Sequence, residues 1–134
     1  MARSGKRARR LVVGGETFLW SVGHSHKVLG NGRYEGCTET VDLRRFKARG
    51  RLRVLFRSGP GRWVSDGYMM VSGAVATEDG RHLNLCEPGT ARALLDEALA
   101  RGWEPDDPVV RELDGWSLFD AVAERRGAAP TPPV

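Results

Sequence analysis

Short β-rich runs separated by glycine turns are the feature that most constrains the fold of this chain. The run "RRLVV" is followed by "GG" and then by "ETFLWSV". A two-residue glycine connection between two β-rich runs is a strong signal for a hairpin. Further turns at "GNGR", "KARG", "GPG" and "EDGR" divide the chain as far as "HLNL". The pattern predicts an antiparallel meander of about six strands, in which Phe18, Trp20 and Val22 share one face.

The pattern becomes helical at "EPGTARALLDEALARGW". Apolar residues recur there at helical spacing, with Pro88 near the start and Gly102 just past the end. A second, shorter helix is predicted from about Gly115 to Arg126, with Asp114 as its N-cap. The segment "EPDDP" between them is interpreted as a linker. The predicted apolar stripes are Ala91, Leu94, Leu95, Ala98 and Leu99 in the first helix and Trp116, Phe119, Val122 and Ala123 in the second.

Strands followed by helices predict an α+β fold, with two C-terminal helices packed on one face of the sheet. A small closed β-barrel with the helices across one end is the alternative architecture. The chain has 134 residues, about the length of one domain. We therefore expect a basic, flexible N-terminus over residues 1–8, a single α+β domain over 9–126 and a flexible, proline-rich tail over 127–134.

The composition is that of a soluble globular protein, with 40% hydrophobic and 28% charged residues. The sequence has no apolar run long enough to predict a membrane-spanning helix. The apolar stretch behind the basic start ends at Gly14, which is too short for a secretory signal. We therefore expect a cytoplasmic protein, in which Cys37 and Cys86 are thiols and not a disulfide.

Charge is distributed very unevenly along the chain. Residues 1–62 hold fifteen Lys or Arg and four Asp or Glu, a net charge of +11. Residues 63–134 hold six Lys or Arg and thirteen Asp or Glu, a net charge of −7. This asymmetry predicts a dipolar molecule with one face suited to anions, without saying which anion.

The most basic stretch is "RRFKARGRLRVLFRSGPGR", with eight basic residues and no acid in nineteen positions. With "KARG" as a four-residue hairpin loop, Phe46 lies opposite Arg51, and Arg44 lies opposite Arg53. Two arginines directly opposite each other destabilise a hairpin by a few tenths of a kcal/mol unless an anion neutralises them. The same register pairs Leu43 with Val54 and Val41 with Phe56 on an apolar face, and Thr40 with Arg57 on the basic one.

The basic face of this hairpin is the candidate functional surface. It fits an acidic protein partner, because charge steers association and aromatic residues anchor it. It also fits RNA or single-stranded DNA, because bases stack on aromatic rings and arginines neutralise phosphates. Solvated arginines on an ordinary sheet face are the alternative without a partner. The candidate binding residues are Arg44, Phe46, Arg51, Arg53, Arg57 and Trp63; Trp63 is either exposed or a core residue at the start of a strand.

Metal binding and catalysis have weaker signals. His24 and His26 are two residues apart, which places both on one face of a strand. With Cys37, His82 and Cys86 they supply ligand types suited to zinc, or a cysteine and histidine pair suited to nucleophilic catalysis. No CxxC or HExxH spacing supports a zinc site, and no glycine turn carries the residues of a phosphate-binding loop. The favoured prediction is therefore a protein without catalytic activity.

The segment "NLCEPGTARALLDEALARGWEPDDP", with "LDGWSLFD" after it, resembles the C-terminal part of small uncharacterised actinobacterial proteins. The resemblance covers about the last third of the chain and brings no activity, cofactor or site residue with it. The sequence thus predicts a binding protein, such as an inhibitor, an immunity-type protein or a regulatory subunit, that engages an acidic protein through its basic face. Nucleic-acid binding is the alternative, and a zinc- or thiol-dependent enzyme is a more distant one.

Overall fold

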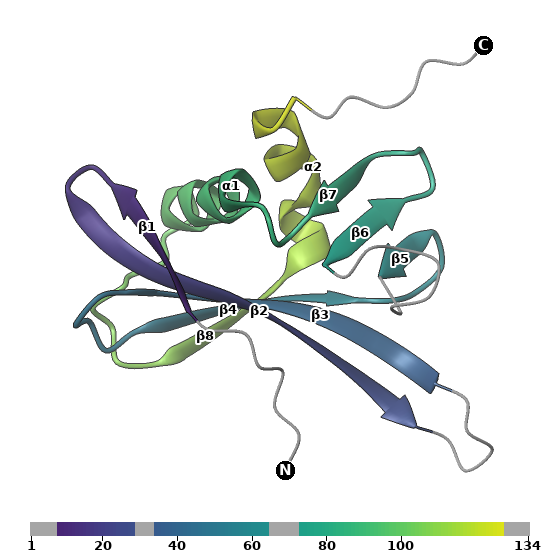
Figure 1. The fold of residues 1–134 in the computed structure, drawn as a ribbon, viewed down its shortest axis with the longest axis horizontal. Helices are drawn as coiled ribbons and strands as arrows, with labels where there is room; N and C mark the ends of the chain where they lie inside the picture. Colours follow the sequence, from purple (N-terminus) through teal and green to yellow (C-terminus); the bar gives the residue numbers. More distant parts are fainter. Residues whose placement is uncertain (1–7, 29–33, 65–72, 128–134) are drawn as a thin grey trace.

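The computed structural model describes residues 8–28, 34–64 and 73–127. Eight strands and two helices make up this part of the chain (Figure 1). The strands are β1 (Arg9–Val13), β2 (Glu16–Val28), β3 (Tyr34–Arg45), β4 (Arg51–Arg57), β5 (Arg62–Val64), β6 (Ala74–Thr77), β7 (His82–Asn84) and β8 (Val110–Asp114). The helices are α1 (Pro88–Ala100) and α2 (Gly115–Arg125).

The strands form two sheets. The large sheet has the order β1-β2-β3-β4-β8, in which the first four strands are an antiparallel meander and β8 is parallel to β4. The small sheet has the order β5-β6-β7 and is antiparallel. In the described residues the strands do not close into a barrel, so the α+β prediction is confirmed and the barrel alternative is wrong.

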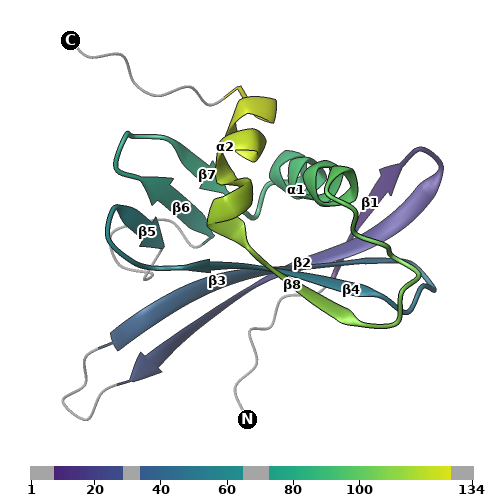
Figure 2. The ribbon, with the colours of Figure 1, turned by 180° about the vertical axis from the view of Figure 1, so that it is seen from behind.

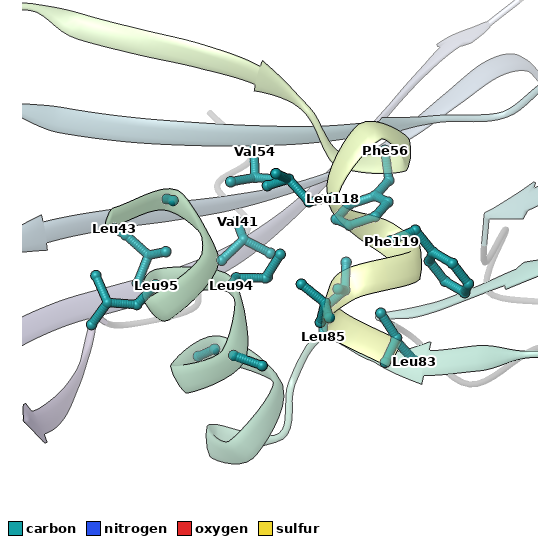
Figure 3. Close-up of a cluster of buried hydrophobic side chains, with 14 of the residues drawn as sticks. Val41, Leu43, Val54, Phe56, Leu83, Leu85, Leu94, Leu95, Leu118 and Phe119 are labelled. Atoms are coloured by element: carbon teal, nitrogen blue, oxygen red, sulfur yellow. The ribbon is translucent and has the colours of Figure 1, made fainter. Parts of the chain in front are cut away.

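Both helices lie on the same side of the large sheet (Figures 1 and 2). We call this side the inner face. Alternation along the strands sends Phe18, Trp20 and Val22 to it, and all three are buried as predicted. Figure 3 shows the core that results, with Val41, Leu43, Val54 and Phe56 of the large sheet facing Leu94 and Leu95 of α1, Leu118 and Phe119 of α2, and Leu83 and Leu85.

The two helices follow their sequence signals closely. Pro88 begins α1, and Gly102, with φ of 97°, follows its end. Asp114 caps α2 by accepting a hydrogen bond from the Trp116 N–H. The predicted apolar stripes are buried, except that Leu99 is exposed. Neither helix has the length and apolar composition that a membrane span requires.

The last strand of the large sheet was not predicted. β8 lies between the predicted linker and the second helix, and it pairs with β4 over five residues. Gly50 lies where the segment before β8 meets β4, and its N–H donates to the Pro105 carbonyl at 2.9 Å. A Cβ at Gly50 would lie 2.5 Å from the same carbonyl oxygen. The close approach of two backbones therefore requires glycine at this position.

The register of the β3–β4 hairpin differs from the prediction by two residues. Arg53 lies opposite Asp42, and not opposite Arg44. The predicted four-residue loop is wrong because β3 ends at Arg45, where the chain turns: the Ala48 N–H donates to the Arg45 carbonyl at 3.0 Å, and Lys47 has φ of 70°. A shift of two residues leaves every side chain on its predicted face. The apolar face is therefore as predicted, although its cross-strand partners are different.

Candidate functional site

The outer face of the large sheet, opposite the helices, is covered by no described element (Figures 1 and 2). Two rows of side chains cross it near the β1–β2 turn. One row runs from Arg10 through Leu19 to Arg44, and Arg51 of β4 continues it to Val110 of β8. The other row joins Val12 and Thr17 to Phe46. We call Arg10, Val12, Leu19, Arg44, Phe46, Arg51 and Val110 the outer patch.

The outer patch exposes apolar side chains. Val12 is 65% exposed, Val110 is 56% exposed and Phe46 is 50% exposed. Lys47 lies above the Phe46 ring, with its Nζ 5.5 Å from the ring centroid. Lys47 also has φ of 70°, so the turn that presents Phe46 contains a left-handed non-glycine residue. Single exposed valines are ordinary. Here Val12 on β1, Phe46 after β3 and Val110 on β8 spread exposed apolar side chains across the width of one sheet face, where a partner could cover them.

The arginines of the outer patch are not neutralised by their own chain. Among the described residues, Arg10, Arg44 and Arg51 have no acidic side chain within ion-pair distance. Arg44 and Arg51 line the same hollow of about 200 Å³, together with Leu19, Ser21 and Asp42. A hollow lined by two arginines, and by an aspartate that is itself paired with Arg53, can hold a carboxylate or a phosphate oxygen.

Arg53 lies on the same face but has a different environment. Its Nε is 3.2 Å from Asp42 Oδ1, and its Nη1 is 4.0 Å from Glu112 Oε2 on β8. The opposition of Arg44 and Arg53 that the sequence predicted is therefore wrong, and the anion that neutralises Arg53 comes from its own chain. Arg53 is a structural part of the face and a weak candidate for binding a partner.

The other predicted binding residues are not all in one place. Arg57 is exposed at the far end of β4, opposite Thr38. Trp63 is 49% exposed, so of its two alternatives the core residue is wrong, and it lies on β5 of the small sheet and not on the outer face. The structure thus brings Arg44, Phe46 and Arg51 together and separates them from Arg57 and Trp63.

The predicted metal ligands lie in different places. His24 and Cys37 are on β2 and β3 of the large sheet, whereas His82 and Cys86 are at β7. The side chain of His26 lies outside the described residues. Among the described residues, no three His, Cys, Asp or Glu side chains are grouped closely enough to hold a metal ion. Cys37 and Cys86 are not joined to each other by a disulfide.

Glu39 is a residue that the sequence reasoning missed. Its side chain is 1% exposed on the inner face, and its Oε1 is 2.8 Å from His24 Nδ1. A buried carboxyl group needs such a partner. Alternation contained the signal, because Glu39 is in phase with Val41 and Leu43, which both point into the core.

The outer patch also contains residues that were missed. Arg10, Val12 and Val110 were not predicted as binding residues. The alternation in "RRLVV" places Arg10 and Val12 on one face, but only the pairing of β1 with β2 shows which face this is. Val110 had no usable signal, because its strand was not predicted. Comparison of the chain with protein-family models, with curated proteins and with solved structures gives no match.

Proposed function

We propose that this protein is a non-catalytic binding protein that engages an acidic protein partner through the outer patch. One observation carries the proposal: the outer patch combines arginines that lack an acidic partner among the described residues with exposed apolar side chains. Arginine and aromatic residues are enriched at the energetic centres of protein interfaces. The apolar side chains supply buried area, and the arginines supply orientation and charge complementarity.

The charge of the partner follows from the hollow between Arg44 and Arg51. An Asp or Glu side chain of a partner is small enough to enter a hollow of about 200 Å³. Its carboxylate would compensate the two guanidinium groups in the wall of the hollow. A neutral or basic partner would leave these charges desolvated and uncompensated, which is unfavourable.

The apolar residues favour protein over nucleic acid. Surfaces that bind single strands carry several aromatic rings on which successive bases stack. Within the outer patch Phe46 is the single aromatic residue, and Val12 and Val110 are aliphatic. Aliphatic side chains pack against the apolar side chains of a protein and offer no stacking surface to a base.

A matched pair of charge reversals tests the proposal. Arg51→Glu alters the outer patch. Arg111→Glu makes the same charge change at an exposed residue of β8 that lies next to Leu52, on the other face of the sheet. The wild-type chain and both variants are immobilised and exposed to native lysate with and without nuclease. Bound proteins are then quantified over a range of salt concentrations.

We expect a stoichiometric acidic protein that survives nuclease and is retained by wild type and by Arg111→Glu. Arg51→Glu should lower its affinity by about tenfold or more, since it removes a charged hydrogen-bond donor from the interface. Equal retention by Arg51→Glu and wild type would exclude the outer patch as the binding surface. Loss of all binding after nuclease, with direct binding to labelled single-stranded RNA, would replace the protein partner with nucleic acid.

A further inference from the structure

A second hollow lies at the small sheet, away from the outer patch. Its volume is about 410 Å³, which is within the range of small-molecule sites. The sheet contributes β6 and β7 to its wall, and the ends of the two helices contribute the rest. In Figures 1 and 2, β7 and α2 lie side by side. The residues that line the hollow are Ala74, His82, Leu83, Asn84, Glu87, Thr90 and Arg126.

One end of this pocket carries an ion pair between an arginine and a glutamate. Arg126, the C-cap of α2, donates from Nη2 to Glu87 Oε1 at 3.0 Å. Its guanidinium group packs against Gly89 in the first turn of α1, in space that a Cβ at residue 89 would occupy. A guanidinium group has five N–H donors, and among the described residues Arg126 forms a side-chain hydrogen bond with Glu87 alone. Its remaining donors are available to a ligand.

The wall of the pocket contains a buried polar residue. Thr90 is completely buried, and its hydroxyl oxygen has no hydrogen-bond partner in the part of the chain that the structure describes. A buried hydroxyl group without a partner is unfavourable and uncommon. Thr90 lies in the first turn of α1, a helix of 13 residues, and the N-cap Glu87 makes no side-chain capping bond. The positive end of the helix dipole therefore adds to the charge of Arg126.

His82, in the wall of the pocket, belongs to a row of side chains on the small sheet. Trp63, Ala76 and His82 lie in register across the three strands of the small sheet and share the face that points away from the core. The small side chain of Ala76 therefore lies between the indole and the imidazole side chains. The indole is half exposed. A planar apolar group can pack on such a surface.

We infer that this pocket binds a small aromatic carboxylate. Its carboxylate lies against the Arg126 guanidinium and the first turn of α1, within reach of the Thr90 hydroxyl. Its ring extends along Ala74 and Ala76 toward Trp63. The ion pair between Glu87 and Arg126 lies at the surface, with both side chains at least a third exposed, and such pairs are weak. A ligand carboxylate can therefore compete with Glu87 for the guanidinium group. The inference does not depend on the proposed function of the outer patch.

Phenylacetate and its neutral amide, phenylacetamide, are suitable probes because they differ only in charge. Binding is measured by ligand-observed saturation-transfer NMR, and tryptophan fluorescence gives the location. The other three tryptophans, Trp20, Trp103 and Trp116, are buried, so a fluorescence change that is absent in Trp63→Phe reports a ligand near Trp63. The variants are Arg126→Gln and Thr90→Val, with Arg125→Gln as the matched control, because Arg125 contacts Glu97 instead. Circular dichroism establishes that each variant is folded.

We expect saturable binding of phenylacetate with a Kd of a few millimolar or tighter, as ligands of this size give. Phenylacetamide and Arg126→Gln should each weaken binding about tenfold, and Thr90→Val should weaken it several-fold. Arg125→Gln should leave it unchanged. The inference is overturned if phenylacetate does not saturate wild type by about 10 mM, if the amide binds equally well, or if folded Arg126→Gln binds like wild type.

Discussion

The arginines in the two halves of the outer face have opposite electrostatic environments. In one half Arg53 lies between Asp42 and Glu112 and is neutralised by its own chain. In the other half Arg44 and Arg51 line a hollow and have no acidic partner among the described residues. All three arginines come from one basic stretch of sequence. Strand register, and not composition, therefore determines which arginines can serve a partner.

β8 contributes to both halves of this comparison. It places Glu112 beside Arg53, and it places Val110 beside Arg51. The same edge strand thus neutralises one arginine and adds an apolar neighbour to another. The net charge of +11 in the first half of the sequence consequently does not predict how much positive charge is accessible on the surface. Acids from the second half of the sequence lie in the same sheet and neutralise part of it.

The largest effect is expected from Gly50→Ala. The new Cβ would collide with two backbone oxygens, those of Pro105 and Asp107, at 2.5 and 2.6 Å. Backbone atoms in a paired segment cannot move easily, so we expect a loss of about 2–4 kcal/mol in the free energy of unfolding, measured by urea denaturation. Gly23→Ala is the control, because nothing lies within 4 Å of its added Cβ. Equal stability of the two variants would contradict the role of Gly50 in docking β8.

The next effect compares two carboxyl contacts of β3. Glu39 is buried and lies against His24, whose side chain is 27% exposed, whereas Asp42 and Arg53 are both more than a third exposed. His24→Ala leaves a buried carboxyl group without this partner, and we expect a loss of about 2–3 kcal/mol in stability. Arg53→Ala should lower stability by less than about 1 kcal/mol, because water replaces the lost contact. Thermal and urea denaturation of the two variants would show the difference, and similar losses would contradict it.

Local patterns predicted the helices and the core face correctly. The spacing of Leu94 and Leu95, the cap at Asp114 and the alternation of Phe18 with Trp20 are each determined by a few neighbouring residues. The predicted meander was correct for the first four strands. It was wrong in treating β5, β6 and β7 as a continuation of the same sheet, because strand order depends on contacts between distant segments.

The candidate site was predictable only in part. Arg44, Phe46 and Arg51 were identified from the clustering of charge around an aromatic residue. Their separation from Arg53 could not be predicted, since it depends on the turn that begins at Arg45 and on the left-handed backbone of Lys47. β8 is short, charged and pairs with β4 in parallel. Such a strand has almost no sequence signal of its own, so the contribution of Val110 was also hidden.

A smaller effect on stability separates the two halves of the outer face directly. Arg53→Glu places a third carboxylate beside Asp42 and Glu112, and we expect a loss of about 1 kcal/mol, reduced by added salt. Arg51→Glu removes a charge that has no acidic partner among the described residues, so stability should change by less than about 0.5 kcal/mol. Denaturation at low and high salt measures both. If Arg51→Glu were the more destabilising variant, the assignment of the two halves would be reversed.

The smallest effect concerns Glu97, which pairs with arginines of the two helices and not of the sheet. It gives a reference value for the contribution of one such ion pair to stability. Hydrogen bonding from Arg101, aided by Arg125, lowers the pKa of Glu97 below its usual value, against the opposing effect of burial. A carboxyl group with a lowered pKa in the folded state stabilises the protein above its unfolded pKa of about 4.3, and this contribution is lost as pH falls through the folded pKa. Glu97→Gln should therefore lower stability at pH 7 by about 0.5–1 kcal/mol.

The difference between Glu97→Gln and wild type should shrink as the pH is lowered below about 4.3. Urea denaturation from pH 7 down to pH 3 measures it, with Glu124→Gln as a control, because this exposed acid of α2 has no ion pair among the described residues. A difference that is independent of pH would mean that Glu97 acts by packing and not by charge. The stability loss of Glu97→Gln at pH 7 can then be compared with the loss of Arg53→Ala. The comparison shows whether ion pairs stabilise the half of the outer face that contains Arg53 as much as they stabilise the helices.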